Sequence, residues 1–277
     1  MVDRVVTEPV AVAKERETRV LETLSLLIPF DLEGERKIRY GKCGDGSYVL
    51  IDRCRPDQDV VSFGIGPSIE FETDMASRGH KVFMFDHTVD ALPNKHPGFV
   101  WTREGICAGN AATNNLRSLQ AHLERLALKS ESLILKIDVE GAEWEIFAEM
   151  PEEVLTRFEQ IAFEAHELQR IQEADFSSLV KRALCKLRKY FTLCHVHANN
   201  FGYVKILDNI PVVDTLELTY IRNGLCNARS SATLYPTDCD TPNFPELPEI
   251  RLWFYPFMPG SQRMGIDSGD LATPSVA

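Results

Sequence analysis

Hydrophobic and polar positions alternate along the chain in two ways that follow one another in a regular order. Short, mostly apolar runs at 59–63, 81–85 and 133–137 are typical of strands that are covered on both faces. Between such runs lie longer segments with apolar residues at helical spacing, of which 176–187 is the clearest. Strands and helices in alternation predict an α/β fold, with a mostly parallel sheet and helices on both of its faces.

Four further segments predict additional strands. Three of them, at 99–101, 158–163 and 191–196, are apolar runs like those described above. The fourth, 215–221, alternates between apolar and polar residues. A period of two is expected of an edge strand that has one face open to solvent. The sequence therefore predicts that the last strand lies at an edge of the sheet.

The two ends of the chain differ in character from its centre. Residues 1–40 are predicted to form a loose arm and then a helix that ends at Pro29, because proline removes a helical hydrogen bond. The main domain spans 41–222. From 223 to 277 closely spaced prolines argue against regular structure, so we expect an extended arm. Its apolar segment 252–255 is predicted to pack on the main domain or on a partner chain, and its final residues are predicted to be disordered.

Composition and charge narrow the class of protein. The chain has 277 residues, of which 44% are hydrophobic, enough for one large core. Its net charge of −11 disfavours a nucleic-acid partner, since proteins that bind phosphate backbones usually carry a basic face. No apolar run is long enough to cross a bilayer, and the amino terminus lacks the apolar core of a signal peptide. The seven cysteines are scattered without a CxxC pair, so we expect a reduced, cytoplasmic protein without a membrane partner.

A glycine-containing loop and an acidic residue occupy the positions expected of a nucleotide site. Gly64 and Gly66 follow one predicted strand, and Asp86 ends the next. Glycines let backbone amides approach a ligand, and the acid can accept both hydroxyls of a ribose. Ile69 stands where the third glycine of the dinucleotide motif GxGxxG would fall, so that motif is incomplete. A tight turn followed by a solvated aspartate is the structural alternative.

The most informative segment is 133–147, LILKIDVEGAEWEIF, in which a buried strand ends at Asp138 before a helix begins. A second predicted strand ends just before Glu164 and His166. In open α/β sheets, ligands bind at the carboxyl ends of the strands. We therefore expect these side chains to share one site with the glycine loop and Asp86.

Two other clusters are predicted to lie near this edge. The glycine-rich segment 41–47 precedes a short strand at 48–51 and is interpreted either as a hairpin turn or as a flap that approaches a ligand. His195 and His197 are two residues apart on a strand and share a face, with Asn199 just beyond. A structural and a functional role for this cluster both remain open.

Several of these motifs resemble those of the FkbM-type and related class I S-adenosylmethionine-dependent methyltransferases. The resemblance is carried by 61–66, 84–87, 135–144 and 216–220, of which 135–144, LKIDVEGAEW, is the most specific. It implies a Rossmann-like seven-stranded sheet whose last strand is inserted antiparallel. It also implies that 41–222 is a methyltransferase domain that transfers the methyl group of S-adenosylmethionine to a hydroxyl of a sugar, oligosaccharide or natural-product scaffold.

The resemblance assigns roles to individual residues. Gly64 and Gly66 match the cofactor loop, Asp86 matches the ribose-binding acid, and His87 belongs to the same cofactor motif. Asp138 matches the acid at the end of strand four, beside the methionine moiety of the cofactor and the acceptor.

Two departures from the family pattern affect the cofactor loop. Ser62 stands where the family has an acid two residues before its first glycine, and Ser68 stands at its third glycine. Contacts to the amino-acid end of the cofactor are therefore expected from Glu70 or from the flap at 44–47.

Two arrangements would remove the proton of an acceptor hydroxyl. In the first, His166 acts as general base and is oriented by Asp138 or Glu164. In the second, Asp138 and Glu164, with His197, bind a divalent cation such as Mg²⁺ that lowers the pKa of the hydroxyl.

Two rival functions remain open. An NAD-dependent oxidoreductase would also place an acid after a glycine loop, and a methyltransferase-like module without activity would keep the fold alone. The expected partners are a small-molecule or saccharide acceptor and no nucleic acid, and a homodimer is also compatible with the sequence.

Overall fold

The computed structural model describes residues 10–42, 44–109 and 115–261. The predicted loose arm at the start of the chain and the predicted disorder at its end fall on 1–9 and 262–277, outside the described residues.

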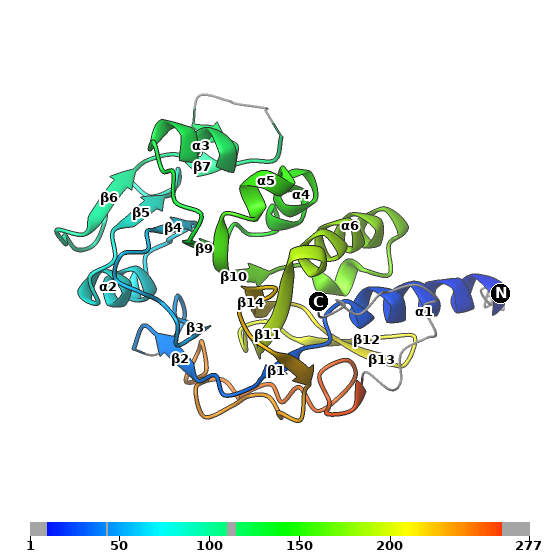
Figure 1. Ribbon diagram of the computed structural model, residues 1–277. Coiled ribbons are helices and arrows are strands. Elements are labelled where there is room, and N and C mark those ends of the chain that lie inside the picture. Colours follow the sequence, from blue (N-terminus) through cyan, green and yellow to red (C-terminus); the bar gives the residue numbers. More distant parts are fainter. Residues whose placement is uncertain (1–9, 43, 110–114, 262–277) are drawn as a thin grey trace.

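A seven-stranded mixed sheet forms the centre of the molecule, in the order β11-β14-β10-β9-β4-β5-β6 (Figure 1). Neighbouring strands are parallel except at β14, which pairs antiparallel with both β10 and β11. This order and the inserted antiparallel strand confirm the predicted Rossmann-like methyltransferase fold class. The strands are β4 (Val60–Phe63), β5 (Val82–Phe85), β6 (Phe99–Thr102), β9 (Leu133–Ile137), β10 (Phe158–Ala165), β11 (Phe191–Ala198) and β14 (Leu216–Arg222).

The prediction that 215–221 is an edge strand was wrong. β14 lies between two other strands, and all of its residues except Arg222 are buried. Two of its polar side chains bind protein groups instead of water, because Thr219 Oγ1 donates to the Val49 carbonyl and Glu217 pairs with His197. The alternation of apolar and polar residues in β14 therefore reflects one apolar and one polar face, and the polar face binds buried protein groups instead of solvent.

The two faces of the sheet are covered differently (Figure 1). Helices pack on one face and share the larger core with alternate strand residues such as Val61 and Phe63. The opposite face carries one helix and a β-hairpin, which pack on Val60, Val82 and Met84. The first face has α1 (Val10–Ser25), α3 (Leu119–Arg125), α4 (Glu143–Glu149), α5 (Glu152–Leu155) and α6 (Ala174–Tyr190), and the second has α2 (Glu70–Ser77), β2 (Lys37–Tyr40) and β3 (Tyr48–Ile51).

The elements that lie outside these two layers are short. They include the pair β7 (Gly105–Ile106) and β8 (Leu116–Arg117), the 3-10 turn η1 (Leu168–Arg170), and the hairpin β12 (Val204–Leu207) and β13 (Ile210–Val213). Among the described residues, no helix has both the length and the apolar character needed to cross a membrane.

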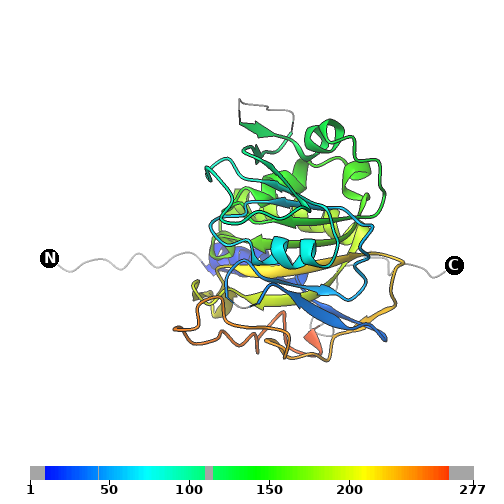
Figure 2. The ribbon, with the colours of Figure 1, turned by 90° about the vertical axis from the view of Figure 1, so that its left-hand side faces the viewer.

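The carboxyl-terminal arm packs along the main domain, next to the β1–β3 region (Figures 1 and 2). The prediction that it lacks regular structure was wrong at one place, because β15 (Ala228–Ser230) pairs antiparallel with β1 (Phe30–Leu32). The predicted apolar anchor lies against the body of the same chain. Leu252 is 1% exposed and belongs to the main core, with Phe254 and Tyr255 packed against that core, whereas Trp253 is 52% exposed.

Candidate active site

The glycine loop after β4 places its two glycines in different environments. Gly64 has a positive φ of 67°, and a Cβ atom there would lie 1.5 Å from the carbonyl oxygen of Asp138. Only glycine fits, because the loop passes directly against the chain that leaves β9. Gly66 also has a positive φ, but a Cβ atom there would meet open space. Its backbone is therefore accessible to a ligand.

Asp86 ends β5 and is held beside this loop. One carboxylate oxygen accepts the N–H of Gly66 at 3.1 Å, and the other accepts the N–H and hydroxyl of Thr88 at 2.7 and 2.6 Å. Burial raises the pKa of Asp86, but these hydrogen bonds outweigh that effect and lower it overall. Asp86 is therefore ionised at neutral pH. His87 is exposed, and its ring lies over Gly105, where a Cβ atom would come within 2.5 Å of Nδ1.

A buried acid missed by the sequence analysis lies beside Ser62. The Ser62 hydroxyl donates to Glu72 Oε1 at 2.5 Å, and Glu72 is 1% exposed. Burial raises the pKa of Glu72, while the charge of Lys136 and the bond from Ser62 lower it. Glu70, which was expected to replace the absent acid, begins α2 and is only partly buried. The signal in the sequence was the position of Glu72 among the apolar residues of α2.

Lys136 and Tyr48 fix the strand-end carboxylate of Asp138. The Lys136 ammonium donates to the Gly64 carbonyl and lies 3.7 Å from Asp138 Oδ2. The Tyr48 hydroxyl donates to the same carboxylate oxygen at 3.1 Å. Because Tyr48 comes from β3, the hairpin on the second face of the sheet contributes directly to the site.

His166 lies in a ring of carboxylates. Its Nδ1 is 3.3 Å from Glu143 Oε1, which also accepts the backbone N–H of His166. Its Nε2 is 3.1 Å from Glu164 Oε2, 3.6 Å from Glu140 Oε2 and 3.8 Å from Asp138 Oδ1. The structure thus brings Asp138, Glu164 and His166 together, as the sequence predicted, and adds the buried Glu143.

The pKa values of His166 and Glu164 are both raised, but for different reasons. Burial lowers the pKa of His166, but hydrogen bonds to Glu143 and Glu164 outweigh it and raise the value to about 11. Burial raises the pKa of Glu164 to about 7, despite its bond to His166. The imidazole is therefore cationic at neutral pH. The group in this pair that exchanges a proton near neutrality is the Glu164 carboxylate.

A row of polar side chains crosses three adjacent strands at this edge. Glu164 on β10 pairs in register with Glu217 on β14, which pairs with His197 on β11. Asn199 Nδ2 donates to Glu164 Oε1 at 2.6 Å. Glu217 accepts from His197 Nδ1 at 3.0 Å and from Asn243 Nδ2 at 2.6 Å. Glu217 and Asn243 were missed by the sequence analysis, because their partners come from distant segments.

The predicted metal ligands Asp138, Glu164 and His197 are not gathered into one set. Both ring nitrogens of His197 face carboxylates, with Nε2 3.1 Å from Glu249 Oε1. Burial lowers the pKa of His197, but the charge of Glu217 and hydrogen bonds to both acids raise it to about 10. Within the described part of the chain, the acids and histidine with ligand atoms within 4.8 Å of one another are Asp138, Glu140 and His166.

The other residues of the histidine cluster connect the sheet to the arm. His195 Nε2 lies 2.8 Å from Asp240 Oδ1, and Asn200 Nδ2 donates to the carbonyls of Phe244 and Leu247. This half of the cluster has a structural role.

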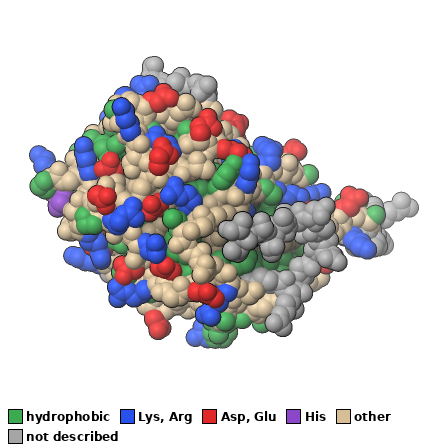
Figure 3. All heavy atoms as spheres, viewed as in Figure 1, with side chains coloured by type: hydrophobic (Ala, Val, Ile, Leu, Met, Phe, Trp, Pro, Cys, Tyr) green, Lys and Arg blue, Asp and Glu red, His purple; other side chains and the backbone are tan. Residues whose placement is uncertain are grey.

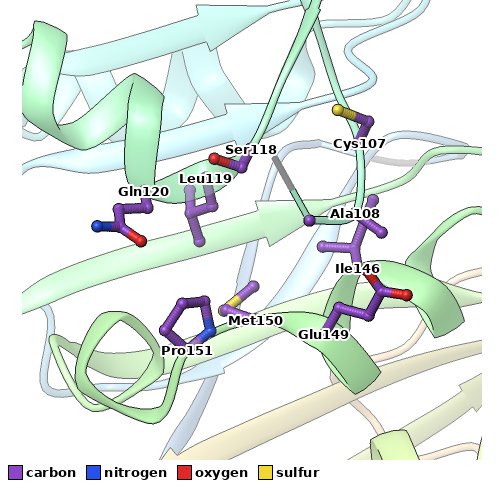
Figure 4. A pocket seen from close by; sticks show the side chains of 10 residues that line it. Cys107, Ala108, Ser118, Leu119, Gln120, Ile146, Glu149, Met150 and Pro151 are labelled. Carbon is purple, nitrogen blue, oxygen red and sulfur yellow. The ribbon is translucent and has the colours of Figure 1, made fainter. Parts of the chain in front are cut away.

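A separate cavity of about 160 Å³ lies between the loop after β7, the start of α3 and the end of α4 (Figure 4). Cys107, Ser118, Ile146 and Met150 are among its lining residues. It is smaller than the roughly 300–1,000 Å³ typical of ligand pockets. None of the strand-end acids lines it, so the candidate site is the sheet edge and not this cavity.

Comparisons with known proteins give a weak structural similarity and no sequence match. No protein-family model matches the chain, and no curated protein matches it. A solved structure described as the 23S rRNA methyltransferase ErmE is similar over 79% of this chain and 69% of that chain, with a TM-score of 0.32 and 12% sequence identity. A similarity of this degree does not extend that protein's activity to this chain, and the FkbM-type likeness stays a likeness of motifs.

Proposed function

We propose that this chain is an S-adenosylmethionine-dependent O-methyltransferase that acts on a hydroxyl of a sugar, oligosaccharide or natural-product scaffold. The observation that carries the proposal is the position of Asp138. The backbone of the glycine loop lies against its carbonyl, while His166 lies 3.8 Å from its carboxylate. A cofactor site and an acid–histidine site therefore meet at one strand end.

The residues on the cofactor side fit S-adenosylmethionine. The open backbone at Gly66 gives access to the loop, and His87 offers an exposed ring beyond it. A carboxylate has about four acceptor sites, so the three donors that bind Asp86 leave room for a ribose hydroxyl. When bound, the cofactor supplies an activated methyl group on a sulfonium centre.

The acceptor side supplies proton removal and orientation. We assign the proton of the acceptor hydroxyl to the Glu164–His166 pair, with the Glu164 carboxylate as the immediate acceptor, because its pKa of about 7 matches a base that works near neutrality. The imidazolium of His166 keeps that carboxylate in place at 3.1 Å. Asp138, held by Tyr48 and Lys136, orients the hydroxyl.

The charge of the site favours a small acceptor over a nucleic acid. Asp138, Glu164 and Glu217 would repel a phosphate backbone, and the net charge of the chain is −11. On the face drawn in Figure 3, basic and acidic side chains are interspersed and form no continuous basic surface.

An isotope-transfer assay tests the proposed function. The full chain is incubated with S-adenosylmethionine that carries a ¹³C methyl group and with a panel of saccharides, and products are read by NMR. We expect a new O-methyl signal that forms about 100-fold more slowly in Glu164→Gln. Glu173→Gln, a change at a residue whose side chain is 51% exposed in a surface ion pair, serves as control.

Two outcomes of this assay would favour the rival interpretations. Binding of the cofactor without transfer to any acceptor would support a module without activity. Loss of transfer in EDTA, restored by Mg²⁺, would support the divalent cation predicted from the sequence, whereas full activity in EDTA would exclude it.

A further inference from the structure

The turn between β2 and β3 brings one more carboxylate to the acceptor side. Asn243 Nδ2 donates to Asp45 Oδ1 at 3.3 Å and to Glu217 Oε1 at 2.6 Å. The turn is fixed to the start of α2, because Ser68 Oγ donates to the Asp45 carbonyl at 3.0 Å. The hairpin turn, β14 and the carboxyl-terminal arm therefore converge at one point, which we call the Asp45 subsite (Asp45, Glu217 and Asn243).

The carboxylate of Asp45 has no direct cationic partner among the described residues, although the charge of Lys136 lowers its pKa in part. Glu217 has His197 as a cationic partner, but Asp45 forms no ion pair with the described residues. Asp45 is exposed at the mouth of the subsite, yet enough protein surrounds its carboxylate to raise its pKa, and repulsion from Asp138 and Glu217 adds to that shift. A cation placed here would relieve this repulsion.

The subsite also contains a buried acceptor that lacks a donor. Asn243 is 4% exposed, and its Oδ1 has no hydrogen-bond partner among the residues that the structure describes. The orientation of the amide is set by its two carboxylate partners, because a flip would place oxygen against oxygen. The unpaired groups of the Asp45 subsite are thus all acceptors. A buried acceptor without a partner is costly, so a ligand with N–H or O–H donors is expected here.

The subsite lies at a defined distance from the reacting end. Asp138 directly follows β9, and Glu217 lies on β14, which is two strands away in the sheet. Adjacent strands are spaced by about 4.8 Å, so the two positions are about 10 Å apart. A group bound at the Glu217 side of the subsite therefore belongs to a part of the acceptor about one sugar ring from the methylated hydroxyl.

We propose that the Asp45 subsite binds a primary ammonium group of the acceptor, so that the substrate is an amine-bearing saccharide or a polyol of similar length. An ammonium supplies three donors and the missing positive charge, and matches the Asp45 carboxylate and Asn243 Oδ1. This inference rests on the proposed function, because it takes the Asp138 end as the place of methyl transfer.

A divalent cation fits the same subsite less well. Asn243 Nδ2 lies between the two carboxylates, so an ion could not contact both of the oxygens that Asn243 binds. Both oxygens of Glu217 already accept hydrogen bonds. Only Asp45 and one amide oxygen remain, so water would have to supply most of the six or more oxygen ligands of Mg²⁺ or Ca²⁺.

Calorimetry with matched disaccharides tests the proposal. The full chain is first saturated with S-adenosylhomocysteine, and a failure to bind this compound contradicts the proposed function and not the subsite. The loaded protein is then titrated with chitobiose, which carries free amines, and with N,N′-diacetylchitobiose, in which they are acetylated. We expect chitobiose to bind at least about tenfold more tightly, as expected for loss of a charge-assisted hydrogen bond.

Variants show whether the preference arises at the Asp45 subsite. We expect Asp45→Asn to remove the preference for chitobiose, and Asn243→Ala to reduce it, with binding of S-adenosylhomocysteine retained. Loss of S-adenosylhomocysteine binding in Asp45→Asn, with the circular dichroism spectrum unchanged, would assign Asp45 to the amino group of the cofactor and overturn the proposal. Asp57→Asn makes the same change of charge at an aspartate that is 80% exposed, outside the subsite, and should leave the preference intact. Equal or undetectable binding of the two disaccharides, or a preference that persists in Asp45→Asn, would overturn the proposal. Asp45-dependent binding of Mg²⁺ alone would overturn it in favour of a metal site.

Discussion

The proposed cofactor side and the proposed acceptor side of the candidate site are built in opposite ways. The cofactor side comes from one continuous βαβ unit, β4-α2-β5, and relies on backbone groups around Gly64 and Gly66. The acceptor side takes single side chains from separate elements, among them Tyr48, Glu164 and Asn243. Backbone recognition is set by local chain geometry, whereas the acidic network depends on the whole fold. The two sides should therefore respond differently to mutation.

The largest effect is expected at the contact between the two sides. In Gly64→Ala the new Cβ would lie 1.5 Å from the Asp138 carbonyl oxygen at a positive φ, so the loop must move. We expect a loss of about 3–5 kcal/mol in the free energy of unfolding, measured by urea denaturation, and loss of S-adenosylhomocysteine binding.

Gly66→Ala is the matched control, because it has the same backbone requirement without the clash. We expect Gly66→Ala to lower the free energy of unfolding by only about 1–2 kcal/mol. Equal destabilisation by the two changes would show that the close approach at Gly64 is unimportant.

The second effect concerns the acceptor side alone. Glu164→Gln removes the proposed proton acceptor and nearly preserves side-chain volume. We expect kcat to fall about 100-fold while the affinity for S-adenosylhomocysteine changes little. Steady-state kinetics together with calorimetry measure the two quantities. A fall in cofactor affinity equal to the fall in kcat would contradict the division of the site into two sides.

The same contrast explains what the sequence predicted and what it missed. Gly64 and Asp86 were found because their spacing lies within one βαβ unit. Asp138, Glu164 and His166 were found because each follows a strand that could be recognised from its apolar residues. Glu217 was hidden in a strand assigned to the edge of the sheet, and Asn243 lies in an arm where no periodic pattern reports packing. Contacts between distant segments leave no local signal.

A pH dependence of activity is expected from Glu164, whose pKa of about 7 is raised by burial. The carboxylate must be ionised to accept a proton, so kcat/KM should rise about tenfold per pH unit below 7 and level off above it. A pH–rate profile of the wild type checks this, and an unchanged acidic limb in Glu164→Gln would exclude Glu164 as its source.

Stability should show the opposite dependence on pH. Because the folded-state pKa of Glu164 is above its ordinary value of 4.5, the folded chain binds more protons between pH 4.5 and 7. The contribution of Glu164 to the free energy of unfolding is therefore most favourable below pH 4.5 and falls as pH rises to 7. The total fall is roughly 3 kcal/mol at most. Urea denaturation of wild type and Glu164→Gln across this range measures the difference.

The smallest effect is expected where the arm meets the sheet. Glu249→Gln removes one of the two carboxylates that hold the His197 imidazolium, and Glu217 retains the other. We expect the free energy of unfolding to fall by about 1 kcal/mol at pH 7. Because the pKa of His197 is raised to about 10, this loss should be full below the ordinary histidine pKa of 6.5 and should vanish as pH rises through 10. A loss that persists above pH 10 would assign it to packing.

The most direct test of the central claim, that the glycine loop and Asp86 bind S-adenosylmethionine, is calorimetry with the reaction product. We predict that S-adenosylhomocysteine binds the wild-type chain, that NAD does not, and that Asp86→Ala weakens binding of S-adenosylhomocysteine by at least about tenfold through loss of its hydrogen bond to the ribose. Binding of NAD, or binding of S-adenosylhomocysteine that is unaffected by Asp86→Ala, would contradict the account.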